Sequence, residues 1–443
     1  MTERKEREIR PLKPENMADY IDIYLNAYPA GKDLSDECRQ KYYDRNLQSL
    51  LEYDHVNFYG MFEKAGGDDG KGIDGGERLI AIMKLIDFDI NLFGEMKRAC
   101  GLMSLGVHPL HKKKGAARDM VRFFETYTTE SGAAVAMLLP FRMDFYRKLG
   151  YGCGTRLDEY HIRTEYLPEC RDISALRFLG RDEVDQVVEC YRWFVEKNHG
   201  AVCKFEEEIR DMRADDDIRR LGCFRGDRLA GYAAFTFVNT SDCNYTLNRM
   251  DVKELVYEDA EVLRQLLGGL RMQSDLAQSV ILRSGEPDFY HLLQSCQDMS
   301  GNYIDFGFLQ TNVSAVGTMY KIPDVKQFVE AASHRRFPPD ALTAGFCVED
   351  ELAGTENRFT LLFAKSADPN VSHWSYDDSR QAYEGADVHV SCRLSDLSSL
   401  LMGSAEFGGL VRLGVMKVSD PAWTGRLDRL LHAEQKPFTN TDY

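Results

Sequence analysis

The chain has 443 residues, of which 44% are hydrophobic, enough for two or three domains that each have a core of their own. Its formal net charge of −16 argues against a nucleic-acid-binding protein, because phosphates require a basic surface. The same charge suits a cationic small molecule or a lysine side chain as substrate, and it equally suits an acidic surface that keeps the protein soluble.

The cysteines and the first residues indicate a reducing compartment. Eleven cysteines occur without a Cys-x-x-Cys pair or zinc-ligand spacing, which predicts buried thiols and no metal site. The start, MTERKEREIRPLK, is highly charged and lacks the apolar segment of a signal peptide. No run of about 18 apolar residues occurs, so we expect a cytoplasmic protein without a transmembrane helix.

The first part of the chain alternates between strand and helix patterns. We expect strands at Glu8–Pro11, Val56–Phe62 and Arg78–Phe88, and helices at Pro14–Ala27 and Leu34–Leu51. One face of the first helix carries an aromatic stripe made of Tyr20, Ile23, Tyr24 and Tyr28. This stripe is interpreted as facing the core or a cleft rather than as a cofactor-binding element.

The segment Lys64–Glu77 contains six glycines and is interpreted as a flexible hairpin connection. It is not a phosphate loop, because it lacks a Gly-Lys-Ser/Thr ending and a following helix. Its aspartates lack the spacing of an EF-hand, so they do not predict a calcium site.

The stretch from Cys100 to Tyr151 organises the rest of the chain. Gly101–Val107 reads as a buried strand, and Ala116–Glu130 reads as an amphipathic helix. Ala133–Leu139 follows as a second apolar run, which predicts the parallel strand of a βαβ crossover.

The turn between that strand and helix predicts a pyrophosphate site. Gly115, Ala116 and Ala117 have little or no side chain, so an anion can reach the free N–H groups at the helix start. Lys112, Lys113 and Lys114 add positive charge. The alternative is a solvated basic helix cap, and the flanking apolar strands favour the phosphate interpretation.

Two blocks in this stretch resemble the acetyl-CoA-binding core of the GCN5-related N-acetyltransferase (GNAT) superfamily. Lys112-x-x-Gly115-x-Ala117 matches the family's Gln/Arg-x-x-Gly-x-Gly/Ala signature in spacing, with Lys in the first position. Residues 145–152, FYRKLGYG, match the Phe-Tyr-x-x-x-Gly-Tyr block. The resemblance implies that Leu105, Gly106 and Val107 lie along the pantetheine arm of CoA, and that this strand's backbone binds the thioester oxygen.

A second domain is predicted from about Arg171, after the strand Arg156–Arg163 completes the first. Residues 183–220 read as charged helices. They are followed by a hairpin, a strand, a helix and a strand at Gly222–Phe235, Met250–Tyr257, Asp259–Arg271 and Ser279–Arg283. This order repeats that of the first domain. An acidic helix start, Glu258-Asp259, repels pyrophosphate, so we expect a copy of the fold without a CoA site.

The third region begins near Ile322 and has an α+β pattern that resembles a sterol-carrier-protein-like domain. Helices are predicted at Val325–Ser333, Leu394–Leu401 and Gly425–Leu431. Strands are predicted at Phe346–Glu349, Phe359–Ala364, Val388–Cys392 and Leu410–Met416.

This order of domains resembles the enhanced intracellular survival (Eis) family of N-acetyltransferases. The expected architecture is α/β (α+β): tandem GNAT folds, each a mixed sheet flanked by helices, and a C-terminal sterol-carrier-like domain. We expect a catalytic domain at residues 1–165, a copy lacking the CoA site at 171–320, and the third domain at 322–443. The resemblance also implies a homo-oligomer, as large as a hexamer.

The resemblance implies two catalytic groups. Tyr146 occupies the position of the general acid, and the terminal carboxylate of Tyr443 that of the base. Burial would have to raise the pKa of this carboxylate, or its main role would be to orient the substrate ammonium. The function expected is acetyl transfer from acetyl-CoA, without a metal, to a polyamine, aminoglycoside or lysine-type amine by direct attack. Neither nucleic acid nor a membrane is an expected partner. The alternative is a protein that senses CoA, or that binds an apolar ligand in the third domain.

Overall fold

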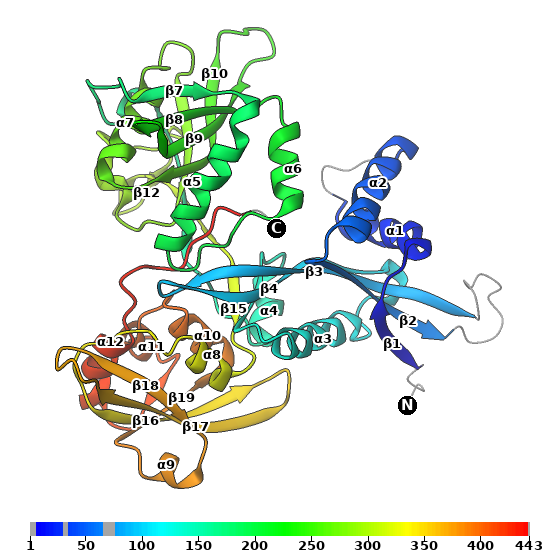
Figure 1. The fold of residues 1–443 in the computed structure, drawn as a ribbon, viewed down its shortest axis with the longest axis vertical. Coiled ribbons are helices and arrows are strands. Elements are labelled where there is room, and N and C mark those ends of the chain that lie inside the picture. The colour runs from blue at the N-terminus through cyan, green and yellow to red at the C-terminus, as the bar shows by residue number, and fades with distance from the viewer. Residues whose placement is uncertain (1–5, 30–33, 65–75, 442–443) are drawn as a thin grey trace.

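The computed structural model describes residues 6–29, 34–64 and 76–441. The chain forms three parts, each built on one large sheet (Figure 1). The segment 65–75, and with it most of the predicted glycine-rich connection, lies outside the described residues. No helix in the described ranges is long and apolar enough to cross a membrane.

The first part has a six-stranded sheet in the order β1-β2-β3-β4-β5-β15. Its strands are β1 (Arg7–Pro11), β2 (Val56–Lys64), β3 (Glu77–Leu92), β4 (Glu95–Val107), β5 (Val135–Leu138) and β15 (Met319–Lys321). Its helices are α1 (Met17–Ala27), α2 (Asp36–Glu52), α3 (Ala116–Glu130) and α4 (Met143–Lys148). Side chains alternate across β3, so Ile82 packs with the core under α1 whereas Met83 packs with the core under α3.

Strands β4 and β5 are parallel, as the sequence predicts, but they pair only over Ala99–Leu102 and Val135–Leu138. Beyond Leu102, β4 keeps only β3 as a neighbouring strand among the described residues. The β3–β4 register shifts between Ile82 and Lys84, and Ser104 adopts a left-handed φ of 51° at this irregularity. The last residues of β4 therefore present a free, bulged edge.

The second part is a seven-stranded sheet in the order β14-β6-β11-β10-β9-β8-β7. Its strands are β6 (Arg156–Arg163), β7 (Leu176–Leu179), β8 (Arg219–Arg225), β9 (Arg228–Asn239), β10 (Asn248–Tyr257), β11 (Ser279–Ser284) and β14 (Val313–Val316). Its helices are α5 (Val184–Lys197), α6 (Glu206–Ala214) and α7 (Ala260–Arg271). A small hairpin, β12 (Tyr303–Ile304) and β13 (Phe308–Leu309), precedes β14.

The prediction that Arg156–Arg163 completes the first domain is wrong. This strand, β6, pairs with β11 and β14, and its Tyr160 and Ile162 belong to the second core. The first sheet is completed instead by β15, which pairs with β5 and contributes Met319 to the first core. The two sheets thus exchange strands, which ties the two parts together.

The third part has a five-stranded sheet in the order β18-β17-β16-β19-β20. The strands are β16 (Leu342–Asp350), β17 (Thr355–Lys365), β18 (Ser372–Asp377), β19 (Val388–Arg393) and β20 (Lys417–Val418). The helices are α8 (Val325–Ala331), α9 (Arg380–Glu384), α10 (Leu394–Leu401), α11 (Phe407–Arg412) and α12 (Thr424–Leu431). The predicted strand Leu410–Met416 is wrong, because most of this segment forms the end of α11 and the turn after it.

The chain end returns to the other two parts. Figure 1 shows the red segment after α12 leaving the third part and running up to the second. On the way, the Thr155 hydroxyl donates a hydrogen bond to the Pro437 carbonyl (2.5 Å). The Thr441 hydroxyl then donates one to the Val202 carbonyl (2.9 Å).

Candidate active site

The turn before α3 has the geometry of an anion site. Gly115 is the N-cap of α3 with a left-handed φ of 86°, and no side chain caps the helix start. Lys113 is also left-handed, with a φ of 63°. Lys112, Lys113 and Lys114 are exposed and come directly before amide groups that no side chain caps, and the Lys114 ammonium donates a hydrogen bond to the Leu110 carbonyl (3.2 Å).

The free edge of β4 leads from this turn toward the interior. Leu105 and Val107 are half-buried, and Gly106 lies under α1, where an added Cβ would lie 3.2 Å from that of Ala27. The Tyr28 hydroxyl, at the end of α1, donates a hydrogen bond to the Leu105 carbonyl (3.0 Å). Tyr28 also contacts the ring of Phe141, which follows β5. The end of α1 therefore lies at the point where β4 and β5 diverge.

Tyr146 lies on α4, close to Tyr28. Its ring is buried against Phe145 and Tyr151 in edge-to-face contacts at 5.1 and 5.8 Å. Burial raises the pKa of Tyr146 to about 12. Burial likewise raises the pKa of Tyr28, and the proximity of Tyr146 adds to that rise.

A cavity of about 410 Å³ opens beside the bulge of β4. Its walls come from α1, α2, β3 and β4 of the first part and from α6 and the segments next to α6 in the second part. Met103 and Ser104 link it to the free edge of β4, and Tyr24 and Tyr42 give it an aromatic side. Its charged lining consists of two cations and four carboxylates: Arg45, Lys84, Glu207, Glu208, Asp211 and Asp215.

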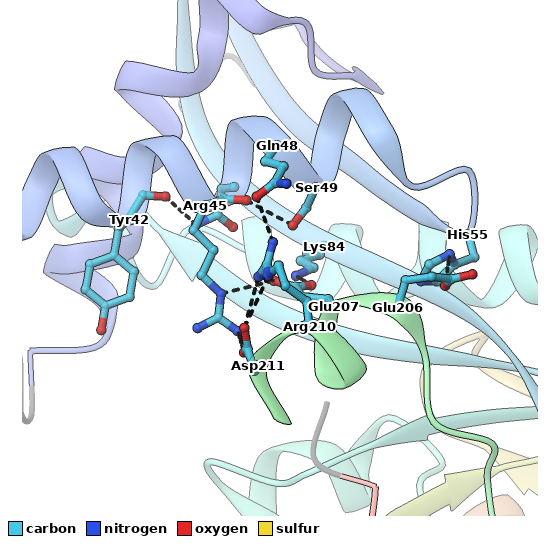
Figure 2. Close-up of polar contacts among 11 residues, drawn as sticks. Tyr42, Arg45, Gln48, Ser49, His55, Lys84, Glu206, Glu207, Arg210 and Asp211 are labelled. Atoms are coloured by element: carbon cyan, nitrogen blue, oxygen red, sulfur yellow. Dashed lines mark hydrogen bonds and ion pairs between the residues drawn. The ribbon is translucent and has the colours of Figure 1, made fainter. Parts of the chain in front are cut away.

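A network of ion pairs crosses from the first part to the second at this cavity, as Figure 2 shows. The buried ammonium of Lys84 on β3 lies 2.5 Å from the buried carboxylate of Glu207 on α6. Arg45 on α2 contacts both Glu207 (3.2 Å) and Asp211 (2.6 Å). Arg210 adds a third cation at 3.8 Å from Glu207.

Burial and charge act in opposite directions on the central pair. Burial is the largest influence on Lys84 and lowers its pKa, although Glu207 attracts the charged form. Burial alone would raise the pKa of Glu207, but Lys84 and Arg45 outweigh it and hold that pKa below its usual value. Glu207 therefore stays ionised.

The chain end approaches the same region. Thr441 is buried, and its hydroxyl also contacts the Tyr191 hydroxyl (3.1 Å). Val202, whose carbonyl accepts a hydrogen bond from Thr441, is three residues before Phe205, which lines the cavity. Tyr443, the base implied by the resemblance, lies outside the described residues.

Three other basic residues of the predicted CoA region have protein partners. Arg142 pairs with Asp144, and Arg147 pairs with Asp396 of the third part (3.0 Å). The Nδ1 atom of His108 accepts a hydrogen bond from the Leu110 amide (3.3 Å), while its Nε2 contacts Arg78 (3.0 Å). Across the described ranges, no group of three or more His, Cys, Asp or Glu residues is arranged to hold a metal ion.

The second part differs at the helix that corresponds to α3. Asp259 caps α7 with its own carboxylate, which accepts hydrogen bonds from the amides of Glu261 (3.0 Å) and Val262 (3.1 Å). The start of α3 thus has amide groups that no side chain caps, whereas the corresponding amide groups of α7 are capped by a carboxylate.

Sequence reasoning missed the roles of Tyr28, Lys84 and Glu207. Tyr28 appeared only as a member of an aromatic stripe, and Glu207 as part of a charged helix. Lys84 carried a usable signal, since it is a single charge inside the otherwise apolar run LIAIMKLI.

Comparison with known proteins agrees with this geometry. Residues 8–154 match the acetyltransferase (GNAT) domain, and residues 325–440 match the sterol carrier protein domain. None of the curated proteins compared with the chain matches it.

Solved structures share the whole architecture. A GCN5-related N-acetyltransferase from Anabaena variabilis is 15% identical with a TM-score of 0.75, covering 99% of this chain and 100% of its own. Eis1 from Mycobacterium abscessus is 18% identical with a TM-score of 0.73 and the same coverage. A probable N-acyltransferase of unknown function from Enterococcus faecalis is 15% identical with a TM-score of 0.70, again with that coverage.

The fold and the domain match show that the chain contains an acetyltransferase (GNAT) domain at residues 8–154. Its architecture, tandem GNAT-like folds followed by a sterol carrier protein domain, is shared along almost the whole length with Eis1.

Proposed function

We propose that this protein transfers the acetyl group of acetyl-CoA to a primary amine of the polyamine, aminoglycoside or lysine type. The amine nitrogen attacks the thioester carbon, the C–N bond forms, the C–S bond breaks, and the amine proton leaves while CoA departs as the thiol. One observation carries the proposal: the free edge of β4 runs from the open helix start at Gly115 to a cavity with an excess of carboxylates.

The residues around the turn suit the acyl donor. The amides of Gly115, Ala116 and Ala117 would hold the pyrophosphate, and the three preceding lysines would neutralise it. The residues at the end of β4, Leu105, Gly106 and Val107, would lie along the pantetheine arm. The edge there pairs with no second strand among the described residues, which supports this role for the groups other than the Leu105 carbonyl, since that carbonyl already accepts a hydrogen bond from Tyr28.

Tyr146 is proposed as the general acid. With a pKa of about 12 its hydroxyl is protonated at neutral pH, and no hydrogen bond from it to another described residue occurs. A thiol has a pKa of about 8.5, which is lower than that of Tyr146. The protonated phenol therefore stabilises the departing thiolate by donating a hydrogen bond to the sulfur. Full proton transfer requires the bound complex to lower the pKa of Tyr146.

The carboxylate of Tyr443 is proposed as the base. The contacts of Thr155, Tyr191 and Val202 with the segment Pro437–Thr441 anchor the chain end, which supports a defined position for the terminal carboxylate. A carboxylate of pKa about 3.5 is a weak base in water, so its action depends on an environment that excludes water.

The cavity beside β4 is proposed as the acceptor site. Four carboxylates against two cations attract an amine substrate, and the rings of Tyr24 and Tyr42 can contact its carbon chain or its ammonium groups. The second part, whose own helix start is closed by Asp259, is proposed to serve by supplying α6 to this cavity rather than by binding CoA.

Mixing the protein with acetyl-CoA and a panel of polyamines, aminoglycosides and lysine peptides tests the proposal. We expect release of free thiol that depends on the amine, with an acetylated product of the expected mass. The absence of amine-dependent thiol release across the panel would refute it.

The alternative, an apolar-ligand carrier, receives less support. The aromatic side chains of the third part pack into a core that also includes residues of the first sheet, and Phe337, Phe346, Phe359, Phe363 and Trp374 are all buried there. The cavity next to that sheet is lined mainly by polar and charged groups, including Arg147, Glu349 and Asp396.

Two further properties are proposed. All eleven cysteines are free thiols, which supports a cytoplasmic protein.

Exposed aromatic side chains on the β12–β13 hairpin, with Phe306 96% and Phe308 69% exposed, support self-association into a homo-oligomer. Light scattering on the purified protein would give the number of subunits, and a monomer would contradict the second proposal.

A further inference from the structure

An amine can attack a thioester only after losing its proton, and free alkyl amines are almost fully protonated near neutral pH. Carboxylates in the acceptor cavity attract the ammonium form, which is the wrong form for the reaction. The cavity therefore needs a feature that favours the uncharged amine close to the thioester.

The inner end of the cavity contains such a feature. The Cα atoms of Lys84 and Met103 are directly paired between β3 and β4, so the two side chains leave the same face of the sheet. Both line the cavity, together with Ser104 at the bulge. Lys84 therefore lies beside the place where the free edge of β4 meets the cavity.

The charge around Lys84 is not cancelled by its partner. Glu207 accepts a hydrogen bond from Lys84 and also contacts Arg45 and Arg210. Asp211, the other carboxylate of the network, contacts the same two arginines. Three cations thus face two carboxylates.

Two more carboxylates, Glu208 and Asp215, line the cavity outside this network, so the cavity as a whole keeps an excess of carboxylates. Glu208 is bound by the buried ammonium of Lys204 (2.7 Å), and Asp215 accepts hydrogen bonds from the amides of Asp217 and Ile218. Besides Arg45, helices α1 and α2 contribute the phenols of Tyr24 and Tyr42 to the lining, and burial raises the pKa of the nearby Tyr20.

We propose that Lys84 holds a fixed positive charge at the inner end of the acceptor cavity, where it disfavours the protonated form of the bound amine and so supplies the reactive nucleophile. Glu207 opposes the fall in the pKa of Lys84 that burial causes, and it holds the Lys84 ammonium in place. The carboxylates farther along α6 attract the amine from solvent, while Lys84 acts on the nitrogen that reacts. This inference rests on the proposed acetyl transfer to an amine.

The test is the single-turnover rate of acetyl transfer to one monoamine, measured against pH for four proteins: the natural chain, Lys84→Met, Lys84→Arg and Lys97→Met. Lys97 is a matched control, because it is a lysine of β4 that pairs with Glu95 away from the cavity. The natural chain should show a rate that rises with pH to a plateau as the amine loses its proton.

Removing the charge should move the midpoint of that rise upward by about 1 pH unit, which is about a tenfold loss of rate below the midpoint. Lys84→Arg should restore the natural midpoint, and Lys97→Met should leave it unchanged. A Lys84→Met protein with a lower rate at every pH but the natural midpoint would overturn the inference, because that result describes a structural role.

If Lys84→Met does not fold, the inference can still be tested on the natural chain. With a series of amines, each midpoint should lie about 1 unit below the pKa of that amine in solution. Midpoints equal to the solution values would contradict the inference while leaving acetyl transfer intact. A chain that transfers acetyl to no amine would instead refute the proposed function, and the inference with it.

Discussion

The hydroxyl of Tyr28 donates a hydrogen bond to the carbonyl of Leu105, joining the end of α1 to the free edge of β4. This contact lies where β4 and β5 diverge, next to the buried Tyr146. The Tyr28→Phe change removes the donor and leaves the ring in place. We expect a loss of about 1 kcal/mol in stability and a several-fold higher KM for acetyl-CoA, because the strand edge is less well positioned. Initial rates measured against acetyl-CoA concentration would give the KM, and an unchanged KM would show that the contact has no role in binding.

Replacing Tyr146 with Phe removes the hydroxyl proposed to protonate CoA. We expect the turnover rate to fall by roughly 100-fold or more, with the affinity for CoA unchanged. The matched control is Tyr245→Phe, since Tyr245 is 87% exposed and remote from the described cavity residues. Equal loss of affinity and rate would indicate that Tyr146 only fills space beside Phe145 and Tyr151.

Deleting Asp442 and Tyr443 tests the carboxylate proposed as the base. The contacts of Thr441 with Tyr191 and Val202 remain in the truncated chain, so its stability should change little. We expect the rate of acetyl transfer to fall by roughly 100-fold. Full activity after the deletion would remove the chain end from the mechanism.

Glu207→Gln should destabilise the protein by about 3 kcal/mol, because it leaves the buried ammonium of Lys84 without its anion. Thermal denaturation of this variant and of Glu206→Gln, whose carboxylate is 65% exposed, would separate the buried pair from a surface one. Equal denaturation temperatures for the two variants would show that the buried pair contributes nothing.

The same pair predicts a pH dependence. The pKa of Glu207 is lower in the folded chain than the unfolded value of about 4.3, so its contribution to stability is present above that value and is lost as the pH falls through the folded pKa. The difference between the natural chain and Glu207→Gln should therefore shrink in acid. A difference that is constant with pH would contradict this assignment.

Local patterns in the sequence predicted single elements well. The bounds of α3 follow from its apolar spacing and from Gly132, whose left-handed φ of 76° ends the helix region. Short apolar runs were ambiguous, and Leu410–Met416 was taken for a strand because a run of this length fits a strand or a buried helix equally.

Non-local relationships could not be predicted in this way. The side chains of β6 and β15 show no feature that decides which sheet each joins, since strand pairing depends on the whole fold. The acceptor cavity likewise forms from residues that are far apart in the sequence. Glu207 is one of three consecutive glutamates on a charged helix, and only its contact with Lys84, 123 residues away, reveals that it is buried.

The most direct test of the account is the affinity for CoA of Gly115→Glu, measured by calorimetry beside Gly132→Glu. Both glycines belong to the ends of α3, both have left-handed φ values, and an added Cβ meets no atom closer than 3.9 Å at either. The strain of substitution is therefore matched, but only Gly115→Glu places a carboxylate at the proposed pyrophosphate site. We predict that Gly115→Glu weakens CoA binding at least tenfold while Gly132→Glu binds as the natural chain does. Equal affinities in the two variants would contradict the claim that the start of α3 binds CoA.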